Sequence, residues 1–224
     1  MTTAKLIYNG QEYDIPVIVG TENEGALDIR KLRDTTGLIT YDPGYANTGS
    51  CQSAITFIDG DRGILRYRGY PIEELAGSVR FSAAAYLMIY GRMPSEAEFM
   101  EWRKQLTLNS LIHASQVNFF DNYSAHAHPM NILSAMVSSI SSFYPHIGGE
   151  NDNMDQHIQR LIGQVKTIAA FSYRKSVGLP YIYPRTDHSY SANFLRMMFA
   201  SPAEEYVVPK VMENALDMLL ILHM

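Results

Sequence analysis

The sequence predicts a mainly α protein with a small β-hairpin region at its N-terminus. Up to about residue 70, short apolar segments alternate with polar residues and are separated by turn dipeptides, which is typical of hairpins. From residue 71 onward, apolar residues recur at three- and four-residue spacing, which is typical of helices that bury one face. We therefore expect a β-rich segment over 1–70 and a helical segment over 71–224.

Composition and charge exclude several classes of function. The chain has 224 residues, 46% of them hydrophobic, and a formal net charge of −5, so a globular core can form and no basic surface for nucleic acid is expected. No stretch approaches the ~20 apolar residues that cross a bilayer, and the first residues lack the apolar core of a signal peptide. The single cysteine, Cys51, cannot form an internal disulfide. Together these features predict a cytoplasmic protein that binds neither nucleic acid nor a membrane.

Two hairpins are expected in the β-rich segment. The dipeptide Asn9-Gly10 accepts the positive φ angles of a tight turn and lies between alternating segments. A second hairpin is expected over 53–70, around the Asp-Gly-Asp-Arg-Gly loop at 59–63. Between them, residues 41–50 are rich in proline, glycine and small polar residues and predict a loop.

The first part of the helical segment carries clear start and stop signals. Pro71 suits the first turn of a short helix, because its missing N–H would have no partner there. Residues 81–91 are apolar nearly all round and predict a helix that is buried on most faces and ends at Gly91. Ser95 and Glu98 have the spacing of a capping box, which predicts the start of another helix.

Four later stretches repeat apolar residues with helical spacing and predict further helices: 129–144, 154–178, 191–200 and 209–224. The last of these has no glycine, proline or basic residue to mark its end. Its apolar residues form one stripe: Val211, Met212, Ala215, Leu216, Leu219 and Leu222. Because such a stripe is too apolar to remain in water, we expect this face to drive self-association.

Several residue groups carry possible chemistry, each with a structural alternative. His126 and His128 have the spacing of two metal ligands on an extended segment, but no third ligand accompanies them, and a polar loop before a helix at Pro129 is the alternative. We expect no metal site. Asp187, His188 and Ser189 have the side-chain types of a hydrolase triad, yet neighbouring residues are not expected to hydrogen-bond as a triad does.

Two further residue types are interpreted as structural. Cys51 lies among small residues without an activating neighbour, so a packed thiol is expected in preference to a nucleophile. Met197 and Met198 are expected in the core. On these grounds alone, the sequence predicts a helical domain without an assigned function.

Three stretches resemble a known family. Residues 28–76 (DIRKLRDTTGLITYDPGYANTGSCQSAITFIDGDRGILRYRGYPIEELA), 183–206 (YPRTDHSYSANFLRMMFASPAEEY) and 215–224 (ALDMLLILHM) resemble bacterial citrate synthases in order and spacing. The last stretch is similar to the start of that family's LLILHADHEQN segment. The resemblance implies a multi-helical large-domain portion, with the family's small domain absent from this sequence.

The resemblance also implies an activity and partners. Citrate synthases are acyltransferases of the tricarboxylic acid cycle that condense acetyl-CoA with oxaloacetate, and they convert the acyl group to an alkyl group on transfer. The implied partners are these two substrates and further copies of the chain in a homodimer or hexamer. No cofactor is implied beyond acetyl-CoA as substrate.

His223 is the one site residue that the resemblance places in this sequence. It matches the first histidine of the family's His-Ala-Asp-His segment, which leads into the oxaloacetate site, while Met224 stands where the family has alanine. The alternative is a frayed terminal histidine. The family's catalytic histidine and aspartate would lie beyond residue 224, so we expect a truncated chain that holds no catalytic residue and is inactive alone.

The resemblance leaves regulation and substrate choice open. NADH-inhibited members of the family have basic residues near positions here occupied by Leu108, Asn109 and Gln164, whereas Arg160 and Tyr144 are compatible with such a site. We expect no NADH control. Methylcitrate synthase remains an alternative enzyme, and a non-catalytic helical assembly module or truncated paralogue remains an alternative without activity.

Overall fold

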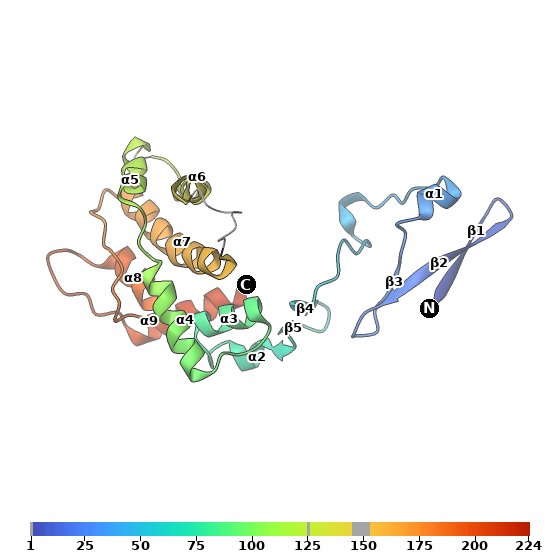
Figure 1. The fold of residues 1–224 in the computed structure, drawn as a ribbon, viewed down its shortest axis with the longest axis horizontal. Coiled ribbons are helices and arrows are strands. Elements are labelled where there is room, and N and C mark those ends of the chain that lie inside the picture. Colours follow the sequence, from blue (N-terminus) through green and yellow to red (C-terminus); the bar gives the residue numbers. More distant parts are fainter. Residues whose placement is uncertain (1, 125, 145–152) are drawn as a thin grey trace. The chain divides into compact units, whose positions relative to one another are not determined.

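A computed structural model describes residues 2–124, 126–144 and 153–224 and shows a mainly α protein, as predicted (Figure 1). The chain forms two compact units, Met1–Ser53 and Ala54–Met224. The division lies upstream of the change in sequence pattern near residue 70. The reason is that the second hairpin belongs to the helical unit, where Tyr67 packs with Leu75 and Leu87.

The first unit is built on an antiparallel sheet of β1 (Thr3–Tyr8), β2 (Gln11–Val19) and β3 (Gly25–Leu27), in that order. Asn9 and Gly10 join β1 to β2 with φ angles of 52° and 78°, so the predicted tight turn is confirmed. The short helices α1 (Leu32–Thr36) and η1 (Pro43–Tyr45) were not expected from the sequence. Neither is long enough to show a helical repeat of apolar residues.

The second unit begins with a small antiparallel sheet of β4 (Thr56–Asp59), β5 (Ile64–Tyr67) and β6 (Tyr70–Pro71), which confirms the second hairpin. The short helix α2 (Ile72–Leu75) follows directly. Pro71 precedes α2 as its capping residue and pairs with Arg66 in the sheet, so it is not the first helical residue.

The helices that follow are α3 (Phe81–Tyr90), α4 (Glu96–Leu108), α5 (Ala114–Val117), η2 (Asn118–Asn122), α6 (Pro129–Ser139), η3 (Ile140–Phe143), α7 (Met154–Ser176), α8 (Tyr190–Phe199) and α9 (Lys210–Leu222). The predicted boundaries are confirmed at two helices. At α4, Ser95 and Glu98 form a complete capping box. At the end of α3, Gly91 takes the left-handed conformation with φ 77°.

The helices bury three hydrophobic clusters. The largest lies where α6 meets α7 and contains Ile132, Met136, Ile168 and Phe171. A second joins the β4–β5 hairpin to α3 and α9, and a third joins α3 to α4 around Trp102. These clusters hold α3, α4, α7, α8 and α9 together as one scaffold, whose members lie side by side in Figure 1.

The approach of α4 to α7 depends on a glycine. A Cβ atom at Gly163 of α7 would lie 2.8 Å from the carbonyl oxygens of Leu106 and Asn109 in α4 and its cap. Only glycine fits at that distance without a shift of one helix. The close packing fixes the position of Lys166, three residues further along α7.

The end of α8 is capped by a buried arginine of α7. Arg174 is 1% exposed, and its guanidinium donates to the carbonyl oxygens of Met197, Met198 and Ala200 at 3.0–3.2 Å and to that of Pro180. These carbonyls would otherwise lack partners at a helix C-terminus. Arg174 therefore locks α8 to α7.

Helix α9 turns its polar side inward. Glu213, Asp217 and Ile221, spaced by four residues, are its buried positions. Members of the predicted apolar stripe are exposed instead, with Val211 at 81% and Leu219 at 54%. The helical periodicity was predicted correctly, and the stripe faces away from the core of this unit.

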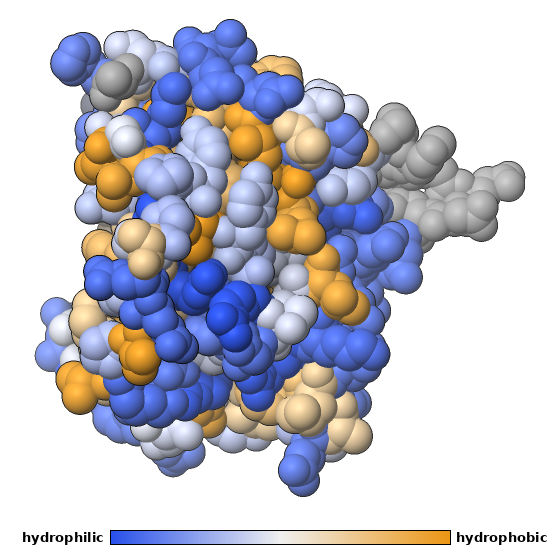
Figure 2. All heavy atoms as spheres, turned by 90° about the vertical axis from the view of Figure 1, so that its left-hand side faces the viewer, coloured by the Kyte–Doolittle hydropathy of each residue, from blue (hydrophilic) through white to orange (hydrophobic). Residues whose placement is uncertain are grey.

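Other hydrophobic side chains also reach the surface. Figure 2 shows one face of the helical unit, where hydrophobic residues lie in separate groups among hydrophilic ones. In the part of the chain that the structure describes, no helix is both long and apolar enough to cross a bilayer.

Candidate functional site

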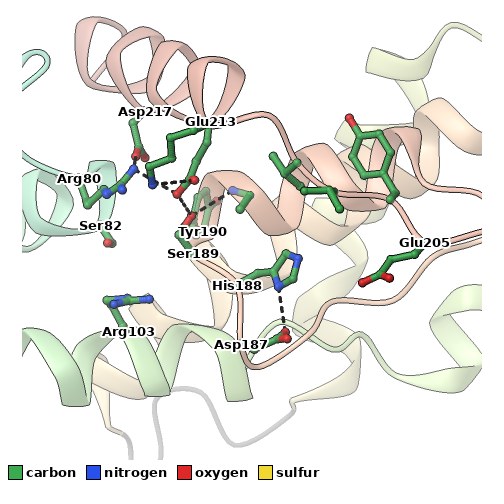
Figure 3. Close-up of a pocket in the computed structure, with 15 residues that line it drawn as sticks. Arg80, Ser82, Arg103, Asp187, His188, Ser189, Tyr190, Glu205, Glu213 and Asp217 are labelled. Atoms are coloured by element: carbon green, nitrogen blue, oxygen red, sulfur yellow. Dashed lines mark hydrogen bonds and ion pairs between the residues drawn. The ribbon is translucent and has the colours of Figure 1, made fainter.

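A pocket of about 460 Å³ lies within the helical unit, where α3 and α4 face α9 and the segments before α8 and α9 (Figure 3). Ser82 of α3 and Arg103 of α4 line one side. Glu213 and Asp217, the inward residues of α9, line the other, and His188 lies in the segment before α8.

The α9 side of the pocket is an ion-pair network. Arg80 lies 2.8 Å from Asp217 and 3.1 Å from Glu213, and Lys210 lies 3.0 Å from Glu213. The hydrogen bond to Asp217 raises the pKa of the Arg80 guanidinium. Burial alone would raise the pKa of the Glu213 carboxyl, but hydrogen bonds from Ser189 and Lys210 outweigh burial and lower it.

Helix N-termini complete this network. Ser189 donates to Glu213 at 2.7 Å, and Ser191 donates to Asp217 at 2.7 Å. The backbone N–H of Phe81, at the start of α3, also donates to Asp217 at 3.3 Å. Both carboxylates are thus engaged by hydrogen bonds and ion pairs, which suits a structural role better than that of a general base.

Two cationic side chains lie at or beside the pocket: Arg103 lines it, and Lys166 lines a small cavity that shares lining residues with it. Lys166 of α7 is 3% exposed, and its ammonium group lies 4.5 Å from the centre of the Tyr190 ring. Burial lowers the pKa of Lys166 to about 8 and raises that of Tyr190. Arg103 reaches into the pocket from α4 and stacks over Phe99, with 5.7 Å from its guanidinium carbon to the ring centre (Figure 3).

The Asp187-His188-Ser189 segment borders the pocket without forming a triad. His188 Nδ1 does lie 2.9 Å from Asp187 Oδ1, but this is one contact and not the linked pair of hydrogen bonds that a triad needs. Arg185 also binds Asp187 and lowers its pKa. Ser189, however, caps α8 by accepting from the Ala192 N–H and donates to Glu213, so it is not activated by His188.

His223, the predicted substrate-binding residue, lies outside this pocket. It is exposed at the C-terminal cap of α9, and its Nδ1 lies 2.7 Å from the carbonyl oxygen of Leu219. Because a carbonyl only accepts, Nδ1 carries the proton in this contact. In this tautomer Nε2 is the ring nitrogen that can accept a hydrogen bond.

The other candidate residues have structural positions. His128 caps α6, where its Nδ1 accepts from the Met130 N–H at 3.2 Å, and His126 is exposed in the preceding loop. Within residues 2–124, 126–144 and 153–224, no three His, Cys, Asp or Glu side chains are grouped as a metal site would require. Met197 is buried, as predicted.

The expectation for Cys51 was wrong. Its thiol is exposed rather than packed. The physical reason is that residues 49–55 form no helix or strand and are themselves exposed, so no neighbour covers the sulfur.

Three of the residues considered for NADH control come together. The Arg160 guanidinium lies 3.7 Å from the centre of the Tyr144 ring, and Gln164 donates to the Tyr144 hydroxyl at 2.8 Å. Leu108 is exposed, and Asn109 caps α4 by donating to the Gln105 carbonyl. Leu108, Asn109 and Gln164, where basic residues were considered for NADH control, are all uncharged in this sequence.

Sequence reasoning found part of the pocket, the segment Asp187-His188-Ser189, and missed Glu213 and Asp217. It also missed Lys166 in the adjoining small cavity. Glu213, Asp217 and Ile221 follow one another at four-residue spacing, so they share one face of α9. Two of the three are acidic, which marks this face as partly polar. That signal was available, but only the apolar stripe of α9, which was expected to drive self-association, was considered. Lys166 carried no such signal, because a single lysine in a helix is most often exposed.

Comparisons with known proteins point to one family. The sequence model of the family described as "Citrate synthase, C-terminal domain" matches residues 44–224. Among solved structures, the citrate synthase of Thermotoga maritima MSB8 is 27% identical, with a TM-score of 0.69 over 82% of this chain and 46% of that one. The citrate synthase of Pyrobaculum aerophilum is 29% identical, with a TM-score of 0.68 over 93% of this chain and 49% of that one.

A third similar structure is the citrate synthase of Thermoplasma acidophilum in a ternary complex with carboxymethyl coenzyme A and oxaloacetate. Its TM-score is 0.72 at 24% identity, over 79% of this chain and 45% of that one, which supports the fold. The chain spans about half the length of these matched structures.

Proposed function

Because the chain belongs to the citrate synthase family, we propose that it forms the large-domain portion of an enzyme that condenses acetyl-CoA with oxaloacetate to give citrate and CoA. The observation that carries this proposal is the family match over residues 44–224 together with the shared fold. The reaction would make the complete enzyme an acyltransferase of the tricarboxylic acid cycle. Its single cysteine is free, which suits a reducing cytoplasm.

The chemistry sets what the complete active site must contain. The methyl group of acetyl-CoA is a weak carbon acid, so a positioned base must remove its proton while a donor stabilises the enol oxygen. Two carboxylates of the described pocket, Glu213 and Asp217, are already bound to Arg80, Lys210 and two serines. A third, Asp187, is bound to Arg185 and His188. We therefore propose that the 224-residue polypeptide has no catalytic residue of its own and is inactive alone.

His223 is proposed as an oxaloacetate contact. Its position at the exposed end of α9 supports this role, as does the bond to Leu219 that orients its ring. Nε2 could accept a hydrogen bond when neutral, and the protonated ring could donate one to a carboxylate. In this proposal α9 positions the imidazole of His223 near the substrate.

Self-association is proposed through the outward stripe of α9, defined here as Val211, Met212, Ala215, Leu216, Leu219 and Leu222. Most of its side chains are exposed, which is unusual for so apolar a helix face in a monomer. A homodimer or a hexamer would remove the stripe from water. Association of this kind is the basis of the alternative function, a helical assembly module without activity.

The experiment that tests the proposed reaction uses the chain extended at its C-terminus with the remaining segment of the Pyrobaculum aerophilum citrate synthase. Release of CoA thiol is followed with oxaloacetate and either acetyl-CoA or propionyl-CoA. Higher kcat/KM with acetyl-CoA supports the proposal. Higher kcat/KM with propionyl-CoA would favour the methylcitrate synthase alternative, and a folded extended chain that releases no thiol with either substrate would contradict both.

A further inference from the structure

A small cavity lined by cations lies beside the main pocket. It has a volume of about 10 Å³, room for about one water-sized atom, and Lys166, Arg103 and Ser82 line it. Ser82, Arg103, His188 and Tyr190 line both the cavity and the 460 Å³ pocket, so the two adjoin. Among the described residues that line the small cavity, no carboxylate is present.

Lys166 has no anionic partner in the described part of the chain. Its one recorded interaction is the contact of its ammonium group with the Tyr190 ring at 4.5 Å. A ring face stabilises a cation by less than a carboxylate does, and the lysine is 3% exposed, so a substantial desolvation cost remains. The lowered pKa of Lys166, about 8, reflects that cost.

The nearby cations and polar groups could converge on one ligand. Arg103 makes a ring contact with Phe99 and, among the described residues, no ion pair through its guanidinium. Ser82 is 5% exposed, and within the described chain no partner is recorded for its hydroxyl. The neighbouring acid, Asp187, is engaged by Arg185 and His188 and so does not neutralise Lys166.

We propose that this cavity binds the oxyanion of a small carboxylate or phosphate, held by Lys166 and Arg103 with the Ser82 hydroxyl as a further donor. One oxygen of the anion fits the small cavity, and the rest of the ligand lies in the 460 Å³ pocket. An arginine and a lysine on one oxyanion give charge-assisted hydrogen bonds, the strongest available to a protein side chain. The site is separate from His223 and does not depend on the proposed reaction.

The test is calorimetric titration of the 224-residue chain with inorganic phosphate and, separately, with malonate, at constant ionic strength. Lys166→Met keeps the length of the side chain and removes the charge, and Arg103→Gln removes the second cation. Lys175→Met is the matched control, because Lys175 lies on the same helix and pairs with Asp121 at 3.8 Å.

Binding of either anion to the unaltered chain and to the Lys175→Met variant, weakened about tenfold or more in the other two variants, supports the proposal. The anion that binds more tightly identifies the group as phosphate or carboxylate. Absence of binding by both anions, or equal binding by the Lys166→Met variant, overturns it. Circular dichroism of each variant shows whether it is folded, so that loss of anion binding is not mistaken for unfolding.

Discussion

The Arg80 guanidinium lies 2.8 Å from the Asp217 carboxylate and thereby joins the start of α3 to the inner side of α9. Asp217 is 5% exposed, and it also accepts from Ser191 of α8 and from the N–H of Phe81. Three helices therefore meet at one carboxylate. This contact orients α9, because the helix that places Asp217 inward must place Leu219 outward.

Replacing Asp217 by alanine should destabilise the helical unit. Removing one partner of a fully buried ion pair costs ~3–5 kcal/mol, and we expect about 2–3 kcal/mol here because the Arg80 side chain is 36% exposed. Urea denaturation monitored by circular dichroism measures the change. Glu204→Ala, at an exposed position before α9, is the control and should change stability by less than ~0.5 kcal/mol. Equal stabilities of the two variants would show that the network does not hold α9.

Arg174→Lys should also destabilise the unit, although the charge is kept. Arg174 uses Nε for Pro180 and Nη1 for the three carbonyls at the end of α8, whereas a lysine has one nitrogen and cannot reach both sets. Loss of the buried, charge-assisted bond to Pro180 predicts about 1.5–3 kcal/mol in the free energy of unfolding. Arg196→Lys on α8 removes a single bond to Tyr183 and should cost less than about 1.5 kcal/mol. A smaller effect at Arg174 than at Arg196 would refute this capping role.

Stability should rise with pH above about 8 because of Lys166. Its pKa in the folded chain is about 8, below the ordinary 10.5, so between these values the unfolded chain binds more protons than the folded chain. The free energy of unfolding then increases with pH, by about 2 kcal/mol up to about pH 9.5. The groups facing Lys166 are Arg103, His188 and Tyr190.

The measurement is a set of urea unfolding curves at about pH 7 and about pH 9.5 for the unaltered chain and the Lys166→Met variant. Only the unaltered chain should gain stability from the deprotonation of Lys166. Other titrating groups are present in both chains, so their effects cancel when the two pH dependences are subtracted. A parallel pH dependence of the two chains would mean that Lys166 titrates normally.

Local signals predicted much of the fold. Asn9-Gly10 specifies a turn, and Ser95 with Glu98 specifies a helix start, because the interactions that decide these features lie within a few residues. The face of α9 that is buried could not be predicted from local signals. Periodicity shows which residues share a face, whereas contacts with Arg80, far away in the sequence, decide which face is buried.

The small cavity at Lys166 was not predictable for the same reason. Lys166 is buried because Gly163 lets α7 approach α4. The residues next to Lys166 in the sequence do not indicate that the two helices pack so closely. The exposure of Cys51 likewise depends on the absence of covering side chains from elsewhere in the unit formed by Met1–Ser53.

The outward stripe of α9 should support association in solution. Charges introduced by Val211→Glu with Leu219→Glu should reduce the average mass seen by multi-angle light scattering, because buried charge opposes apolar contact. Met100→Glu with Leu161→Glu introduces the same charge at exposed apolar positions of α4 and α7 and is the control. A monomeric unaltered chain at high concentration, or equal effects of both pairs, would contradict association through α9.

The formation of citrate by the 224-residue chain, alone and with the Pyrobaculum aerophilum extension, tests whether this chain needs further residues for the reaction. Both proteins are purified free of host citrate synthase and incubated with acetyl-CoA and oxaloacetate, and citrate is measured by mass spectrometry. We expect no citrate from the chain alone, citrate from the extended chain, and less citrate from the extended chain with His223→Ala. Citrate produced by the 224-residue chain alone would contradict the proposal that it has no catalytic residue of its own.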